Sequence, residues 1–197
     1  MTRLAPLPHS SWGDDERAAL AGAFGNAAAD QFASGARETP NVLGTLLHHP
    51  ALAGPFLAYN NVLLRTPSLD ARLRELVVLR VAWRTRAPYE WAQHARLATG
   101  LGISVDDIDA ITRGAEAECW SELEASVLTA TDQCIERYRI DDGTWSRLAK
   151  ELDERQLVEL VFVVGTYTAL AMAFNSFGLE LEAELHEFAA PFPAIEE

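Results

Sequence analysis

Residues 72–94 read RLRELVVLRVAWRTRAPYEWAQH, and this stretch decides the fold of the chain. Its apolar residues predict a helix that Ser68 caps and that ends before Pro88, because a proline disfavours the helical conformation of the residue before it. The next helix is expected over 89–100 and closes on a glycine. The segment therefore predicts two consecutive helices joined by a short connection.

Three side chains that can donate or accept a proton lie on these two helices: Glu75, Glu90 and His94. Glu90 and His94 are four residues apart and share a helix face, so they form a carboxylate–imidazole pair that fixes the ring tautomer and suits a general base. Pairs of this kind also occur on surfaces without a role. Glu75 has apolar neighbours on its face, and burial would raise its pKa and suit it as an acid. The alternative is an ion pair with Arg72 at the rim of the helix.

Helical signals continue along the rest of the chain, and no window alternates in the manner of a strand. Ser104 with Asp107, and Ser121 with Glu124, are typical of capping boxes. We expect an all-α protein of about ten helices with short connections. These helices are expected over 14–34, 40–49, 50–65, 68–86, 89–100, 104–114, 121–138, 144–152, 154–178 and 180–190.

The composition excludes several classes of partner. The chain has 197 residues, 49% of them apolar, which is enough to bury a core. Its 29 acidic and 16 basic residues give a net charge of -13, so nucleic acid and anionic membranes are not expected as partners. An anionic substrate remains compatible with this negative net charge, since a few arginines in a pocket can bind a carboxylate.

Two further features bear on the compartment. Residues 160–179 carry no charge and are about long enough to cross a bilayer. Their polar residues and the acidic flanks Glu159 and Glu180 favour a buried helix instead. The two cysteines, Cys119 and Cys134, are too far apart on a helix to pair, and such sparse use of cysteine fits a reducing cytoplasm. We therefore expect a cytoplasmic protein.

Neither a metal nor a nucleotide cofactor is expected. His48 and His49 are adjacent and cannot share a helical face, H-E-x-x-H is absent, and no glycine-rich phosphate loop occurs. The residues around the glutamate–histidine pair are rich in arginine and aromatic rings, which could line a pocket for a flat anionic molecule or simply pack. These residues are Arg80, Trp83, Arg84, Tyr89 and Trp91.

The pattern R-x-R-E-L-V-V-L-R-V-A-W, followed by Tyr89-Glu90-Trp91-x-x-His94 and A-x-x-x-G-L, resembles the carboxymuconolactone decarboxylase family and the wider alkylhydroperoxidase superfamily. The resemblance is best over 72–111 and looser over 40–178, where it includes Val164-Gly165-x-Tyr167. It implies a compact multi-helix bundle that forms a homo-oligomer. It also implies a single domain over 1–197, of which 1–39 is an N-terminal helical extension.

The superfamily's peroxidase branch has a glutamate, a C-x-x-C twelve residues later and a histidine four residues after the second cysteine. Here these positions hold Glu75, the sequence Ala87-Pro88-Tyr89-Glu90, and His94. Thiol peroxidase activity is not expected, because it requires a thiolate and a resolving thiol. The decarboxylase branch has a glutamate where Glu90 stands. Thr168 departs from the histidine expected in close relatives, which implies a changed substrate or activity.

The resemblance thus implies cofactor-free acid–base chemistry on a small carboxylated lactone or related organic acid, by decarboxylation or isomerisation. Glu75, Glu90 and His94 would be catalytic, with His94 as proton donor. Arg80, Arg84, Tyr89, Trp91 and Tyr167 would contact the substrate. The alternative is a non-catalytic helical oligomer for binding or scaffolding, in which the three catalytic candidates would be solvated. The substrate and the size of the oligomer do not follow from the sequence.

Overall fold

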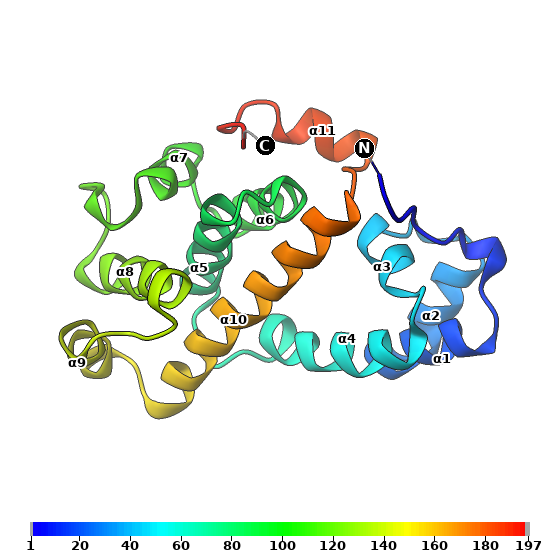
Figure 1. Ribbon diagram of the computed structural model, residues 1–197, viewed down its shortest axis with the longest axis horizontal. Helices are drawn as coiled ribbons and strands as arrows, with labels where there is room; N and C mark the ends of the chain where they lie inside the picture. Colours follow the sequence, from blue (N-terminus) through cyan, green and yellow to red (C-terminus); the bar gives the residue numbers. More distant parts are fainter. Residues whose placement is uncertain (1, 196–197) are drawn as a thin grey trace. The chain divides into compact units, whose positions relative to one another are not determined.

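The computed structural model describes residues 2–195, which hold eleven α-helices, two short 3-10 helices and no strand (Figure 1). The predicted all-α class is confirmed. The helices are α1 (Asp14–Phe24), α2 (Asn26–Ala33), α3 (Asn41–Leu46), α4 (Pro50–Arg65), α5 (Ala71–Arg84), α6 (Pro88–Gly100), α7 (Val105–Arg113), α8 (Glu122–Arg137), α9 (Asp142–Glu151), α10 (Glu154–Phe177) and α11 (Ala183–Ala189); η1 (His9–Ser11) and η2 (Gly114–Glu116) are the 3-10 turns.

The described chain divides into two compact units. One consists of residues 2–66 with 176–182, and the other of residues 67–175 with 183–195. All three predicted catalytic residues lie in the second unit. The expected single domain over 1–197 stays a prediction.

The first unit is built on α1 and α4, which pack closely. A Cβ atom added to Gly54 on α4 would lie 3.2 Å from the Cα atom of Ala19 on α1. The core of the unit is apolar and includes Trp12, Leu20, Phe32, Leu47 and Leu57. The single helix expected over 14–34 is wrong: Gly25 has a φ of 86°, which ends α1 and starts α2.

Helix α5 forms the centre of the second unit. It is buried over the whole of residues 73–82, so both its apolar and its charged side chains are inside the protein. Its N-terminal cap is Asp70, whose carboxylate accepts hydrogen bonds from the backbone N–H groups of Arg72 and Leu73. The predicted cap Ser68 is wrong. The N–H group of Ser68 instead donates to the carboxylate of Glu159 on α10, 2.7 Å away.

The other boundaries follow the sequence closely. Both predicted capping boxes form, at Ser104 with Asp107 and at Ser121 with Glu124. The last helix is shorter than expected, over 183–189 instead of 180–190. Helix α10 is long and apolar enough to span a bilayer, but half of its most apolar window is buried inside the protein. This burial is typical of a core helix in a soluble protein, as the sequence predicts.

Candidate active site

The site is built where α5 packs beside α6. Glu75 lies in the middle of α5 and His94 in the middle of α6, and both are buried. The Nδ1 atom of His94 lies 2.7 Å from Oε2 of Glu75, a charge-assisted hydrogen bond. Because this bond occupies Nδ1, the Nε2 atom is the ring nitrogen that can act on a ligand.

Arg74 holds the other oxygen of the same carboxylate. Its Nε and Nη2 atoms lie 3.1 and 3.0 Å from Oε1 of Glu75. Burial is the largest single effect on Glu75 and raises its pKa, but His94 and Arg74 together outweigh it, so the net pKa is lowered. The expectation that Glu75 has a raised pKa is therefore wrong, and so is its expected pairing with Arg72. Arg72 binds Asp107 and Glu124.

Glu90 has the opposite environment. It lies on the first turn of α6, is 1% exposed, and neither of its carboxyl oxygens has a hydrogen-bond partner. Burial raises its pKa well above the usual range, which favours the protonated form of its carboxyl group. The predicted hydrogen bond between Glu90 and His94 does not form. The imidazole bonds to Glu75 on the neighbouring helix instead.

An aromatic ring covers one side of the imidazole. Tyr167 on α10 meets the His94 ring edge-on, with 4.9 Å between ring centroids and an interplanar angle of 87°. Tyr167 is 2% exposed, so its ring shields this side of His94 from water. Tyr89 on α6 is also 2% exposed and packs edge-on against Phe174, with 5.5 Å between ring centroids. The predicted residue Tyr167 is thus brought to His94 by α10, whereas the ring contact of Tyr89 is with Phe174.

The two predicted arginines have partners within the chain. Arg80 binds Asp132 on α8 at 2.8 and 2.7 Å and also donates to the carbonyl groups of Ile111 and Thr112. Arg84 binds Asp132 and Glu136. The guanidinium groups expected to hold a substrate carboxylate therefore bind carboxylates of α8.

The Trp83 and Trp91 rings pack against each other, with centroids 5.5 Å apart, as the packing alternative predicted. Trp91 is nevertheless notable, because its indole Nε1 is buried without a hydrogen-bond partner one residue after Glu90. Among residues 2–195, no three His, Cys, Asp or Glu side chains group together as a metal site.

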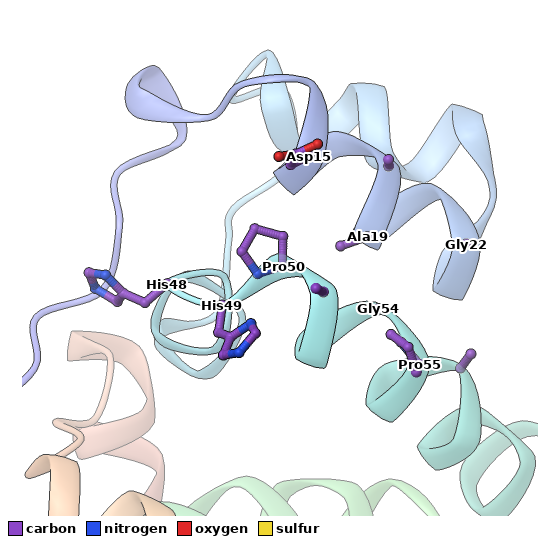
Figure 2. A pocket seen from close by; sticks show the side chains of 11 residues that line it. Asp15, Ala19, Gly22, His48, His49, Pro50, Gly54 and Pro55 are labelled. Carbon is purple, nitrogen blue, oxygen red and sulfur yellow. The ribbon is translucent and has the colours of Figure 1, made fainter.

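A separate groove lies in the first unit, between α1 and α4 (Figure 2). Its volume is about 820 Å³, and small residues such as Ala19 and Gly54 form much of its wall. Asp15 and His49 are its polar residues at one end. None of the predicted site residues lines this groove.

The comparisons with known proteins agree with this fold. The chain resembles the alkylhydroperoxidase AhpD core of an uncharacterized peroxidase-related protein from Ralstonia eutropha JMP134, with a TM-score of 0.78, 15% identity, and coverage of 98% of this chain and 97% of that one. It also resembles the debrominase Bmp8, with a TM-score of 0.75, 16% identity, and coverage of 97% and 98%. No curated protein matches the chain.

These likenesses define an all-helical protein of the alkylhydroperoxidase-like fold. Residues 50–133, which hold Glu75, Glu90 and His94, match the carboxymuconolactone decarboxylase family. The family model thus matches the part of the chain that carries the residue pattern, and the solved structures share its fold.

Proposed function

We propose that this protein is a cofactor-independent acid–base enzyme that decarboxylates or isomerises a small carboxylated lactone or related organic acid. The observation that carries the proposal is the contrast between two buried carboxyl groups around His94. Glu75 is bonded to His94, and its pKa is lowered, while Glu90, four residues before His94 on the same helix, has no hydrogen-bond partner, and burial raises its pKa. Neighbouring groups whose pKa values are pushed apart are typical of acid–base catalysis.

His94 is the group that moves protons. Glu75 accepts the Nδ1–H bond, which orients the ring and leaves Nε2 to take a proton from the substrate or return one to it. Glu90 has a different task. As a protonated acid with no partner in the protein, it can donate its O–H to a carbonyl oxygen of the substrate.

In an isomerisation, the C–H bond next to the carbonyl breaks and its proton passes to Nε2 of His94. The electron pair forms an enolate whose oxygen accepts the hydrogen bond from Glu90, and the imidazolium then returns the proton to a different carbon. In a decarboxylation, the C–C bond to the carboxylate breaks and CO₂ leaves. The electron pair again forms an enolate, which the imidazolium of His94 protonates at carbon.

The burial of the site supports an enzyme over the scaffold alternative, which expects solvated side chains. Glu75, Glu90 and His94 are all buried. The likeness to a debrominase, one variant of which was solved in complex with 2,3,4-tribromopyrrole, is a likeness to an enzyme on the same fold. Burying ionisable groups costs folding free energy, and such groups are concentrated at functional sites. Their presence here therefore supports a catalytic role.

The test is turnover of a panel of carboxylated γ-lactones and β,γ-unsaturated or β-keto acids, followed by proton and carbon-13 NMR in D₂O. Deuterium incorporation at the carbon next to the carbonyl reports proton transfer, and loss of the carboxyl carbon signal reports decarboxylation. Glu90→Gln and His94→Gln are each expected to lower kcat by about 10²- to 10⁴-fold. Unaltered turnover in both variants would overturn the proposed roles.

Two controls separate this chemistry from other activities. The double substitution Cys119→Ser with Cys134→Ser is expected to leave turnover unchanged, because neither thiol belongs to the site. Trp145→Phe, on exposed surface of α9, controls for non-specific effects of substitution.

A further inference from the structure

A smaller pocket lies in the first unit, and none of the predicted site residues lines it. Its volume is about 290 Å³, close to the lower end of the range for small-molecule pockets, about 300 to 1,000 Å³. Its walls come from the segment before α1, from the turn after α2 and from the start of α3. The pocket is thus of a size for a small metabolite.

The apolar walls of this pocket are held in place by the backbone. Pro6, Pro8 and Pro40 line it, and each proline ring fixes the φ angle of its residue. The N–H group of Leu7 donates to the carbonyl oxygen of Gly44 on α3, 3.0 Å away. A Cβ atom added to Gly44 would lie 2.9 Å from Cβ of Pro6, so the two segments are in direct contact. The pocket therefore has a preformed apolar surface.

Arg37 brings a positive charge to the pocket. Its guanidinium lies over the ring of Phe32, with Cζ 4.6 Å from the ring centroid, and its backbone N–H group donates to the carbonyl oxygen of Gln31. The cation–π contact leaves the N–H groups at the edge of the guanidinium available to an acceptor. Among residues 2–195 the ion pairs involve other arginines, although the chain has a net charge of -13. Arg37 is therefore a cation that can bind the carboxylate of a ligand.

Glu38 brings a negative charge beside Arg37. It lines the same pocket, and the ion pairs of the described residues do not include it. Because the two residues are consecutive, their Cα atoms are about 3.8 Å apart. The first N–H group of α3, that of Asn41, is already used, since it donates to the Glu182 carboxylate, 2.7 Å away. The pocket thus offers one cation and one anion at short range beside an apolar surface.

From these observations we propose that the pocket binds a free α-amino acid with an apolar side chain. Such a zwitterion carries its ammonium and carboxylate groups on one carbon atom, so its charges match the closely spaced Arg37 and Glu38. The carboxylate binds the guanidinium edge, the ammonium group binds Glu38, and the side chain packs on the proline rings. His9 and Thr39, which also line the pocket, add hydrogen-bonding side chains. Both charged residues are exposed, so we expect weak binding, with a Kd on the order of 1 mM.

The first test is an NMR titration of the full ¹⁵N-labelled chain with three probes of similar size. These are L-phenylalanine, 3-phenylpropanoate, which lacks the ammonium group, and 2-phenylethylamine, which lacks the carboxylate. L-phenylalanine is expected to shift the amide signals of Gly35 and Gly44, which line the pocket, and to bind about fivefold more tightly than either analogue. No shift of these signals at about ten times the expected Kd, or equal binding of either analogue, would overturn the proposal. The result does not depend on the proposed acid–base chemistry.

Substitutions test the two charges separately. Arg37→Met is expected to weaken L-phenylalanine binding about fivefold. Arg65→Met is the matched control, because Arg65 also lies over a phenylalanine ring but does not line the pocket. Glu38→Gln is expected to weaken the binding of L-phenylalanine and to strengthen that of 3-phenylpropanoate, since it removes the repulsion between two carboxylates. Equal effects of the two arginine substitutions, or a Glu38→Gln variant that binds both probes as the native chain does, would contradict the proposal.

Discussion

Glu75 and Glu90 are buried carboxyl groups on the neighbouring helices α5 and α6, and their different partners account for the opposite directions in which their pKa values move. Glu75 is fully buried, yet Arg74 and His94 lower its pKa by charge and hydrogen bonding. Glu90 is buried to the same degree with no partner, so its pKa rises. Burial is thus common to both, and the difference comes from two side chains, one beside Glu75 in sequence and one on the next helix.

Arg74 is predicted to be essential to the site's stability. Replacing it by Met removes one of the two groups that keep the Glu75 carboxylate ionised inside the protein. A buried ion pair that loses one partner costs about 3–5 kcal/mol, and we expect a loss towards that range in the free energy of unfolding at pH 7. Because the pKa of Glu75 is lowered in the folded state, this stabilisation is present above the ordinary carboxyl pKa and is lost as the pH falls.

Urea unfolding at pH 7 measures the Arg74 effect. Arg72→Met is the matched control, since Arg72 is on the same helix but its side chain is partly exposed in its ion pairs with Asp107 and Glu124. The control is expected to lose no more than about 1 kcal/mol. Equal losses in the two variants would mean that the carboxylate of Glu75 does not depend on Arg74.

The substitution Glu90→Gln is predicted to stabilise the protein increasingly as the pH rises. Below the ordinary carboxyl pKa, both the folded and the unfolded native chain are protonated at this position. Above it, the unfolded chain ionises first, because burial raises the pKa of Glu90 in the folded state, and the native protein loses stability. The loss amounts to about 1.4 kcal/mol for each unit between the two pKa values.

Glutamine does not titrate, so the stability difference between Glu90→Gln and the native chain should widen as the pH rises above the ordinary carboxyl pKa. Urea unfolding at a series of pH values measures it, and Glu116→Gln, on the 3-10 turn η2, serves as the carboxyl control. Parallel pH profiles for Glu90→Gln and the native chain would show that Glu90 is ionised in the folded protein.

Sequence reasoning predicted three candidate site residues but not the hydrogen bond that joins Glu75 to His94. The spacing of Glu90 and His94 correctly indicates one helix face. It cannot reveal that Glu75 lies across a helix–helix contact and competes for the imidazole, because that contact is tertiary. Arg74 was missed because adjacent residues on a helix normally point apart. Only the distance of 3.0 Å between its guanidinium and the Glu75 carboxylate identifies it.

Among the helices, the junction between α7 and η2 depends on the backbone conformation of one glycine, Gly114. Gly114 has a φ of 73°, and a Cβ atom added to it would lie 2.6 Å from the Arg80 guanidinium. That guanidinium is held by Asp132 and by the carbonyl groups of Ile111 and Thr112. A side chain at this position would therefore strain the backbone and displace Arg80 from these bonds.

Gly114→Ala is predicted to destabilise the protein by about 1–3 kcal/mol, through backbone strain and displacement of Arg80. Gly100→Ala, at the end of α6, meets nothing within 4 Å and should be neutral or stabilising by about 0.4–1 kcal/mol. Thermal unfolding of the two variants beside the native chain makes the comparison. Similar melting temperatures for both would show that Arg80 yields easily.

The helices themselves were largely predictable, and the errors have local causes. Proline positions and capping boxes fix many helix ends through bonds between near neighbours, and these predictions are confirmed at Ser104 and Ser121. Gly25 was overlooked inside an Ala-rich run that otherwise favours one helix. Ser68 is not the cap, because α5 begins at Ala71 and Asp70 is the residue directly before it. The choice between two candidate caps so close in sequence depends on the residue at which the helix begins.

At the scale of the whole molecule, charge repulsion opposes folding. The 29 acidic residues exceed the 16 basic ones, so at least 13 carboxyl groups have no cation to pair with. Several of the arginines are already shared, as Arg72 is between Asp107 and Glu124. Most of the acidic side chains therefore repel one another at neutral pH.

Salt is accordingly predicted to stabilise the protein at pH 7. Raising NaCl from about 0.02 to about 0.15 M shortens the screening length to about 8 Å, which weakens repulsion between exposed carboxylates more than it weakens buried pairs such as Arg74 with Glu75. We expect the free energy of unfolding to rise by on the order of 1 kcal/mol. The effect should disappear near the calculated isoelectric point of about 4.8, where the net charge vanishes. Urea titrations at both pH values and both salt concentrations test this, at a protein concentration low enough to keep the chain monomeric. Destabilisation by salt at pH 7 would mean that surface ion pairs, and not the excess of carboxylates, dominate the electrostatics of the fold.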